Sequence, residues 1–532
     1  MTDPPATDPP EADRAETDQS EAVAFLRSGR ACAGCGRVEV VETHGALVFL
    51  CPDEALKIKR AVRYDYMDFT TLAAREEMLR RELSLNRPGA PALYRDVVPL
   101  TRQSDGSLAL DGGGAPVEWV LRMARFPRSA ELVEVAERGE LDERLAERLG
   151  REIQAWHARC EIRPAGGARL IGDILDELER VLADMAEALD ADRIARFHER
   201  ARRVHSDQSG LLDARAEAGH VRRGHGDLHL GNIVMLEGAP VLFDALEFDE
   251  TLGTCDTLYD LAFLLMDLWH RGLRGQANAV LTSYLLAAGG EEDGGTAALP
   301  LFLAVRAAIR AMTTVQSERA RGVAHGGAGA AYLDAALAFL APAPTALVAV
   351  GGLSGTGKTR LARALAPDLG APPGAVHLRT DTERKAMAGV SAEAELGAEH
   401  YTDAARHAVY ERLTARARTL LAADRSVLLD ATFQDGAERE IAEAAADPSG
   451  AAFAGLWLDA PPQVLVARVA GRRGDASDAD PEVLQRQLEA AAPPGSWHRI
   501  DASGSPEDTR RHARDALAPV PGVGEALSGP DD

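Results

Sequence analysis

The spacing of hydrophobic and polar residues changes several times in the first part of the chain. Three short apolar runs between residues 38 and 59 favour β-strands. Residues 69–86 follow a helical pattern that Pro88 and Pro91 end, and a further strand pair is expected over 94–123. Beyond this point the pattern is mostly helical, over 141–218 and 256–340, with strand and loop character over 219–248. The pattern predicts a small strand-rich part followed by a larger helical part.

A different pattern begins after residue 345. Residues 346–350 form a short apolar strand, which opens an alternating α/β stretch to about residue 516. The preceding residues contain two prolines and are typical of a linker. The chain is therefore expected to have a disordered acidic, Pro-rich tail at 1–21, a first domain at 22–340, a linker at 341–345, a second domain at 346–516 and a flexible tail at 517–532.

Composition narrows the class of protein. A chain of 532 residues is too long for one core, and its net charge of −24 disfavours nucleic acid as a partner. No run approaches the roughly 18 apolar residues of a membrane span, and the N-terminus lacks the features of a signal peptide. Five cysteines in so long a chain do not make a disulfide framework. These features favour a cytoplasmic enzyme with no membrane partner, and they leave its oligomeric state open.

The clearest motif in the second domain is G-x-x-x-x-G-K-[ST], which residues 352–359 match between a strand and a predicted helix. Its glycines let backbone N–H groups surround phosphates, its lysine reaches the β- and γ-phosphates of ATP, and its last hydroxyl binds Mg²⁺. The predicted ATP-binding residues are Gly352, Ser354, Gly355, Thr356, Gly357, Lys358 and Thr359, of which Thr359 is also a metal ligand.

Polar residues near the ends of later strands supply candidate chemistry. Asp381, expected at the end of a strand over 376–381, is placed to accept a hydroxyl proton, or alternatively to cap a helix. Arg384 is suited to an anionic group of the substrate, and Asp430 to holding Mg²⁺ through water. Arg472, with Arg468 and Arg473, is expected on a lid that neutralises charge on the transferred phosphoryl group, or on a solvated helix face.

These motifs resemble the small P-loop kinases grouped with 5′-hydroxyl polynucleotide kinases, zeta-type toxins and chloramphenicol phosphotransferases. The resemblance covers about residues 345–515. It implies a P-loop NTPase α/β fold with a mostly parallel sheet and phosphoryl transfer to a hydroxyl. In that family pattern Asp381 would be the base and Arg384 would contact the substrate.

A second motif, His225-Gly-Asp-Leu-His-Leu-Gly-Asn232, lies in the first domain. An Asp followed five residues later by an Asn suits a catalytic loop, in which Asp227 accepts a hydroxyl proton and Asn232 binds Mg²⁺. Asp244 ends the next predicted strand, which is the usual place of the principal Mg²⁺ ligand. The loop resembles that of the aminoglycoside phosphotransferase and choline kinase branch of the protein-kinase-like α+β fold, although Leu230 stands where proline is frequent.

That resemblance implies a strand lysine paired with a helix glutamate. The chain has only four lysines, and Lys57 and Lys59 alternate along one predicted strand and share a face. Either can reach the phosphates of ATP; Lys57 is preferred, with Glu82 as its partner. A phosphotransferase-like domain ahead of a P-loop kinase domain also resembles bacterial two-domain proteins described as bifunctional aminoglycoside phosphotransferase/ATP-binding proteins.

The sequence supports three functional hypotheses. The first is an enzyme with two ATP- and Mg²⁺-dependent kinase sites that act independently on hydroxyl groups of small molecules. The second is a nucleic-acid 5′-hydroxyl kinase with an accessory domain, and the third is a regulator that binds ATP without catalysis. Cys32 and Cys35 have the spacing of a zinc knuckle and could also form a redox pair, but the interpretation preferred here is two ordinary thiols.

Overall fold

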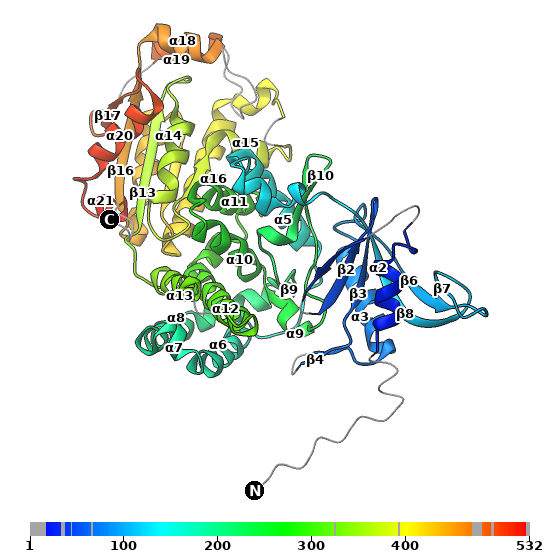
Figure 1. Cartoon of the computed structure of the whole chain (residues 1–532). Coiled ribbons are helices and arrows are strands. Elements are labelled where there is room, and N and C mark those ends of the chain that lie inside the picture. Colours follow the sequence, from blue (N-terminus) through cyan, green and yellow to red (C-terminus); the bar gives the residue numbers. More distant parts are fainter. Residues whose placement is uncertain are drawn as a thin grey trace. The chain divides into compact units, whose positions relative to one another are not determined.

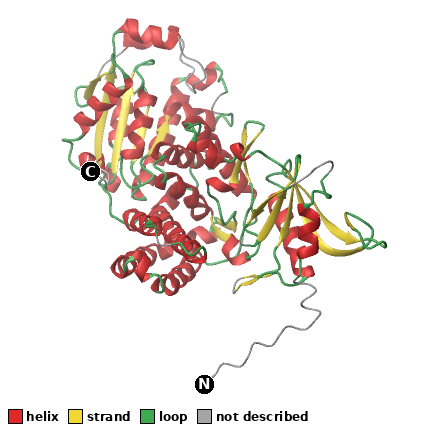
Figure 2. Ribbon diagram, viewed as in Figure 1, coloured by secondary structure: helices red, strands yellow, loops and turns green. Residues whose placement is uncertain are grey.

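The computed structural model describes residues 18–32, 38–43, 45–64, 67–323, 326–391, 394–470, 481–490 and 494–527. It forms two compact units (Figures 1 and 2). The first comprises Met1–Glu140 and Arg223–Cys255, and the second Leu141–Arg222 and Asp256–Asp532. The helical segment that precedes the linker therefore clusters with the P-loop part of the chain rather than with the N-terminal strands.

The first unit is built on a six-stranded antiparallel sheet in the order β1-β2-β3-β8-β6-β7. Its strands are β1 (Glu39–Glu42), β2 (Ala46–Leu50), β3 (Glu54–Lys59), β6 (Tyr94–Arg102), β7 (Leu108–Leu110) and β8 (Ala115–Ala124). Side chains alternate between the two faces of such a sheet. Leu56 and Ile58 pack on one face with helix α2 (Ser20–Arg27). Lys57 and Lys59 lie on the other, toward helix α3 (Leu72–Asn86).

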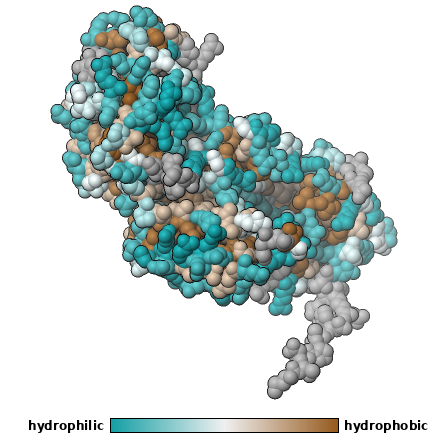
Figure 3. Space-filling view, turned by 60° about the vertical axis from the view of Figure 1, so that its left-hand side comes forward, coloured by the Kyte–Doolittle hydropathy of each residue, from teal (hydrophilic) through white to brown (hydrophobic). Residues whose placement is uncertain are grey.

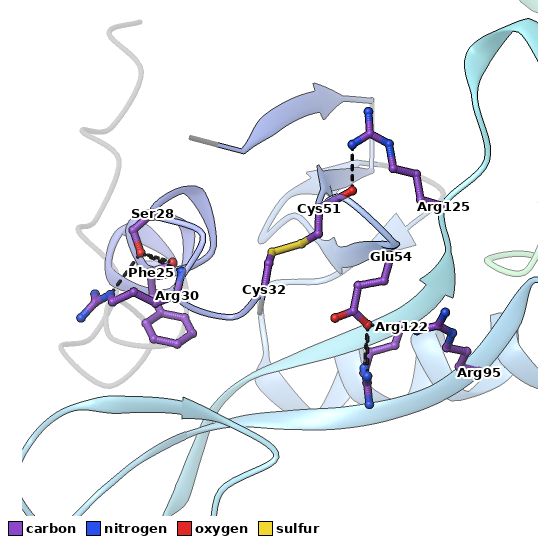
Figure 4. Close-up of a disulfide and its surroundings, with 9 residues drawn as sticks. All are labelled: Phe25, Ser28, Arg30, Cys32, Cys51, Glu54, Arg95, Arg122 and Arg125. Carbon is purple, nitrogen blue, oxygen red and sulfur yellow. Dashed lines mark hydrogen bonds and ion pairs between the residues drawn. A yellow bond between two sulfur atoms is a disulfide. The ribbon is translucent and has the colours of Figure 1, made fainter. Parts of the chain in front are cut away.

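A disulfide ties the N-terminal segment to this sheet. Cys32, which follows α2, is bonded to Cys51 at the end of β2, and the carbonyl oxygen of Cys51 accepts a hydrogen bond from Arg125 (Figure 4). The interpretation of Cys32 as an ordinary thiol is therefore wrong, because the fold brings the two sulfurs together. Cys35 lies outside the described residues. Gln19 and Ser20 are also ordered, so residues 18–21 do not belong to the predicted disordered tail.

The first unit also contains a short hairpin between two loops. Strands β10 (Ile233–Leu236) and β11 (Ala239–Leu242) pair antiparallel. The loop that carries Asp227 precedes the hairpin, and the loop that carries Asp244 follows it. The hairpin therefore fixes the spacing between the two candidate acidic residues.

The second unit contains a helical layer, as the sequence pattern predicted. Its long helices are α5 (Glu143–Arg159), α6 (Gly167–Ala183), α8 (Ala191–Glu217), α10 (Thr257–His270), α11 (Arg274–Ala287), α12 (Leu299–Ala320) and α13 (Ala328–Phe339). Helix 293–320 is long and apolar enough to cross a membrane, unlike any run expected from the sequence, but 67% of its apolar window is buried inside the unit. A core helix passes the same test, so this is weak evidence for a membrane span.

The P-loop part of the second unit is a five-stranded parallel sheet in the order β14-β15-β13-β16-β17, which confirms the predicted α/β class. Its strands are β13 (Ala346–Gly352), β14 (Val376–Arg379), β15 (Val427–Asp430), β16 (Ala452–Asp459) and β17 (His498–Asp501). Helices α14 (Lys358–Leu365) and α20 (Pro506–Leu517) share the core beside β13.

Two details of this part differ from expectation. Helix α15 (Thr380–Met387) begins directly after β14, so Asp381 lies in the first turn of a helix rather than at the end of a strand. Helix α21 (Val523–Leu527) lies in the predicted flexible tail, yet Val523 and Leu527 are buried in the same core as β13. Burial of these apolar side chains accounts for the order of residues 517–527.

On the face that Figure 3 shows, hydrophobic residues lie scattered among hydrophilic ones.

Candidate active sites

A buried cluster of charges lies between β3 and α3 in the first unit. Glu82 is fully buried, and its two carboxylate oxygens accept hydrogen bonds from Lys57 and Lys59, each at 2.7 Å. The Lys57 ammonium also reaches Asp244, at 2.8 Å. Burial favours the neutral amine, but Asp244 and Glu82 outweigh it and raise the pKa of Lys57 well above its ordinary value. Lys57 is therefore a fixed positive charge directly beside Asp244.

The second lysine has a further partner that the sequence did not indicate. Lys59 forms an ion pair with Glu247, which is almost fully buried. Burial raises the pKa of Glu247, although Lys59 opposes this. In the sequence, Glu247 is visible only as an acidic residue three positions after Asp244. Its contact with Lys59 depends on the tertiary fold, which the sequence pattern does not show. Lys59 is thus held between two glutamates, whereas Lys57 contacts both Glu82 and Asp244.

The backbone around Asp244 is held in an unusual shape. Its φ is 60°, in the left-handed region that non-glycine residues seldom adopt. The Asp244 N–H donates to the Tyr94 hydroxyl at 3.0 Å, and the next N–H donates to Asn86 at 2.9 Å. Burial raises the pKa of Asp244, but the positive charge and hydrogen bond of Lys57 lower it by more, so the pKa lies below its ordinary value. Asp244 is therefore an ionised carboxylate in a fixed, half-exposed position.

The loop 225–232 carries the second acidic residue. Asn232 donates through its side-chain amide to the backbone oxygen of Asp227 at 2.9 Å and to its carboxylate at 3.0 Å. His225 donates from Nε2 to the Phe243 carbonyl at 2.9 Å, which joins this loop to the residue before Asp244. The charge of Asp227 acts to raise the pKa of Asp244, so the two carboxylates lie near one another.

The phosphate loop of the second unit has the conformation its glycines allow. Gly352, Gly355 and Gly357 all have positive φ, and at Gly352 a Cβ would lie 2.6 Å from the Leu458 carbonyl oxygen. Lys358 folds back on the loop and donates to the Leu353 carbonyl at 3.0 Å. The Ser354 N–H donates to the side-chain oxygen of Gln487, from helix α19 (Pro481–Ala490), at 2.9 Å. The Gln487 side-chain oxygen thus occupies the Ser354 N–H, one of the loop N–H groups that bind phosphate oxygens in such loops.

Beside this loop lies a buried acid. The Thr359 hydroxyl donates to Asp430 at 2.7 Å, and His377 contacts the same carboxylate oxygen through Nε2 at 3.3 Å. Burial raises the pKa of Asp430, but the His377 hydrogen bond and the nearby positive charges lower it well below its ordinary value. Burial lowers the pKa of His377. Asp430 is therefore ionised. His377 was not among the site residues predicted from the sequence.

The two residues predicted to act on the acceptor are paired with each other. Arg384 donates to the Asp381 carboxylate at 3.1 Å, one helical turn away, and its guanidinium lies 4.9 Å from the centre of the Tyr401 ring. The helix N-cap is Arg379, so Asp381 is not the cap of α15. Arg472 lies outside the described residues, as does Arg473. Arg468 donates to the backbone oxygens of Ala502 and Gly504 and so braces the fold.

The donor atoms of both sites suit a hard divalent cation. Mg²⁺ prefers carboxylate, amide and hydroxyl oxygens and usually keeps several waters. Asp244 and Asn232 offer such oxygens in the first unit, and Thr359 and Asp430 in the second. Within the described ranges, no group of three or more His, Cys, Asp and Glu residues is arranged to hold a metal without other ligands. The donor atoms at both sites therefore fit Mg²⁺.

Two family models match different parts of the chain. A family model described as a phosphotransferase enzyme family matches residues 108–299, and one described as an AAA domain matches 347–494. The uncharacterized proteins Rv2004c of Mycobacterium tuberculosis and Mb2027c of Mycobacterium bovis are each 30% identical over 482 residues, which cover 88% of this chain and 93% of the relative.

Kinases are among the solved structures that are similar to parts of the chain. A choline/ethanolamine kinase family protein from Mesorhizobium loti is 17% identical and covers 60% of this chain and 98% of its own, with a TM-score of 0.36. A gluconokinase from Sinorhizobium meliloti is 22% identical and covers 35% of this chain and 94% of its own, with a TM-score of 0.25.

Proposed function

The chain belongs to the family of these mycobacterial proteins and contains a phosphotransferase domain and a P-loop kinase domain. From this premise we propose that the protein is an ATP- and Mg²⁺-dependent kinase with two phosphoryl-transfer sites. The observation that carries the proposal is the same set of groups in both places. Each site has a lysine, an acidic ligand for Mg²⁺ and a further carboxylate. In the first unit these are Lys57, Asp244 and Asp227. In the P-loop part they are Lys358, Asp430 and Asp381.

In the first unit, Lys57 would bind phosphate oxygens while Glu82 keeps its ammonium in place. Asp244 and Asn232 would hold Mg²⁺, which when bound with ATP offsets the negative charge of the β- and γ-phosphates. Asp227 would orient the acceptor hydroxyl and take its proton, since its carboxylate is half-exposed and fixed by Asn232. The acceptor oxygen then attacks the γ-phosphorus as the bond to the β,γ-bridging oxygen breaks.

In the second unit, the backbone N–H groups of residues 354–359 and the Lys358 ammonium would surround the phosphates. Gln487 would have to release the Ser354 N–H when a phosphate oxygen takes its place. Thr359 and Asp430 would hold Mg²⁺. Asp381 would accept the hydroxyl proton, and Arg384 would hold both Asp381 and an anionic part of the acceptor. Arg472 would neutralise negative charge on the transferred phosphoryl group.

We expect small-molecule alcohols as acceptors, because a net charge of −24 disfavours polyanions such as nucleic acids. A kinase that consumes ATP is expected in the cytoplasm. The decisive experiment incubates the purified protein with Mg-ATP and a metabolite pool and identifies the phosphorylated products by mass spectrometry. Asp227→Asn should abolish one activity and Asp381→Asn another, each by about 10²–10⁴-fold, with ATP affinity within a few fold of wild type.

Asp192→Asn, which removes an exposed carboxylate in the helical layer, is the control and should change neither activity. Phosphorylated 5′ ends in an oligonucleotide arm would instead support the nucleic-acid kinase. ATP binding without any turnover, in the wild type and in both variants, would support the regulator.

A further inference from the structure

Helix α11 of the helical layer lies along the open edge of the parallel sheet. β14 is an edge strand, and its unpaired backbone groups would otherwise be available to another strand. Asn278 donates through one amide nitrogen to the carbonyl oxygens of Pro373 and Ala375, at 3.0 and 2.8 Å. Thr282, one helical turn later, accepts the His377 N–H at 3.4 Å. The helical layer thus replaces a sixth strand at this edge.

A charged network continues from this edge to helix α15. The Arg416 guanidinium, from helix α16 (Asp403–Ala422), donates to both carboxylate oxygens of Asp293, at 2.8 Å each. Its third nitrogen donates to Glu383 on α15. Glu383 also accepts from Arg412 at 2.9 Å. Asp293 follows α11 in the helical layer, so the Arg416 guanidinium links that layer to α15. Arg412 makes a second, half-exposed link, because it also donates to the Gly289 carbonyl at 3.0 Å.

These charges are withdrawn from solvent almost completely. Asp293 is 1% exposed, Arg416 5% and Glu383 0%. Buried ion pairs often contribute little net stability because desolvation offsets their attraction, and their best-attested use is to fix one arrangement of the parts they join. A forked guanidinium bound at two sides is suited to that use, because it constrains direction as well as distance.

Glu383 stands between Asp381 and Arg384 on α15, and the three side chains extend from one turn of helix. We propose that Arg416 is a positioning residue of the P-loop site, which fixes the helix carrying Asp381 and Arg384 against the helical layer through Glu383 and Asp293. The inference rests on the proposed function of the P-loop site, since it assigns α15 to acceptor binding. It makes the helical layer a structural part of the P-loop kinase.

The chain offers a matched control in the residue before Asp293. Glu292 is also buried, at 6% exposed against 1% for Asp293. It contacts Arg215 at 2.7 Å, the Thr257 hydroxyl at 2.9 Å and His220 at 3.0 Å, all within the helical layer. Asp293→Ala and Glu292→Ala therefore remove neighbouring buried carboxylates, each paired with one arginine. Only the first is bonded to the arginine that holds α15.

The experiment measures amide hydrogen exchange in the full-length protein, followed in peptides that cover residues 376–390. Asp293→Ala should speed exchange in α15 about tenfold or more, as expected for loss of a buried charged partner. Glu292→Ala should leave α15 at the wild-type rate even if both variants lower Tm. Equal acceleration in both variants, or none in Asp293→Ala, would overturn the proposal.

Two further readings separate this proposal from the proposed function. Turnover at the P-loop site should fall in Asp293→Ala while its Mg-ATP affinity, measured by calorimetry, stays within a few fold. If the wild type shows no turnover at this site, the proposed function fails, yet the exchange comparison still decides the role of Arg416. Arg416→Lys retains a charge and loses the fork, so it should give intermediate exchange; it also replaces Asp293→Ala if that variant does not fold.

Discussion

At the scale of single residues, the two lysines of β3 are distinguished by their contacts. Lys57 touches Asp244, and Lys59 is held between two glutamates. Lys57→Met should therefore weaken Mg-ATP binding in the first unit by about tenfold or more, the value of a charge-assisted hydrogen bond. Lys59→Met should chiefly lower Tm, because it leaves Glu247 buried without its ammonium partner. Calorimetry and thermal unfolding of the two variants check this, and the reverse assignment of effects would contradict it.

Glu292 gives the helical layer an acid-sensitive contact. Burial raises its pKa, but His220 and Arg215 lower it more, to about 2 from an ordinary value of 4.5. The unfolded chain binds the proton first as pH falls, so this contribution is fully present above about pH 4.5 and is lost on the way down to about pH 2. The shift corresponds to about 3 kcal/mol.

The Tm of Glu292→Gln should therefore lie below that of the wild type at pH 7, and the difference should shrink as pH falls below 4.5. A difference that stays constant between pH 7 and pH 3 would show that hydrogen bonding or packing, rather than charge, stabilises this position.

Motif spacing predicted the loop and strand residues of both candidate sites, and the resemblance to kinases implied the pairing of Lys57 with Glu82 that the structure shows. Such motifs are readable because the chemistry demands particular residues at particular spacings within one strand or loop. Glu247, His377 and Gln487 escaped notice because each acts through contacts with distant segments. The left-handed backbone at Asp244 was also hidden, since an aspartate gives no sign of positive φ.

At the scale of elements, hydrophobic periodicity predicted the helical layer and the strands of both sheets except β17, His498–Asp501. It could not predict which face of α11 covers which strand, because α11 is buried on several sides and has no single apolar stripe. The same limit applies to α21, whose five residues are too few to show a period. Its burial depends on the sheet core assembled from distant segments.

The contact between α11 and β14 can be tested by one truncation. Asn278→Ala removes two hydrogen bonds to otherwise buried carbonyl oxygens and should cost about 2 kcal/mol of folding free energy. Gln276→Ala, on the same helix, removes one bond to the Leu141 carbonyl and serves as the control. Thermal unfolding should show a clearly larger fall in Tm for Asn278→Ala. Equal shifts would mean that the sheet edge does not depend on this helix.

At the scale of the whole molecule, the linker at 341–345 does not mark a structural division. Those residues form neither helix nor strand, as expected, but the helices before them and the sheet after them belong to one compact unit. Distant sites behave independently only when they share no partners. Here the helical layer shares buried partners with the P-loop part through Asn278 and Arg416, so two separable modules are no longer the expected arrangement.

A cut in the linker tests this arrangement without changing any contact. A protease site inserted at 341–345 should be cleavable, because these residues carry no regular structure and chain breaks are tolerated at such positions. The two fragments should nevertheless elute together in gel filtration, since the edge of β14 and the buried Asp293–Arg416–Glu383 contacts stay intact. A fragment of residues 344–532 expressed alone should instead aggregate, because its sheet edge is uncovered and its Arg416 lacks Asp293, the partner that binds two of its three nitrogens. If the cleaved fragments separate and the second stays monomeric with full Mg-ATP affinity, the P-loop domain is self-sufficient and the helical layer does not support its site.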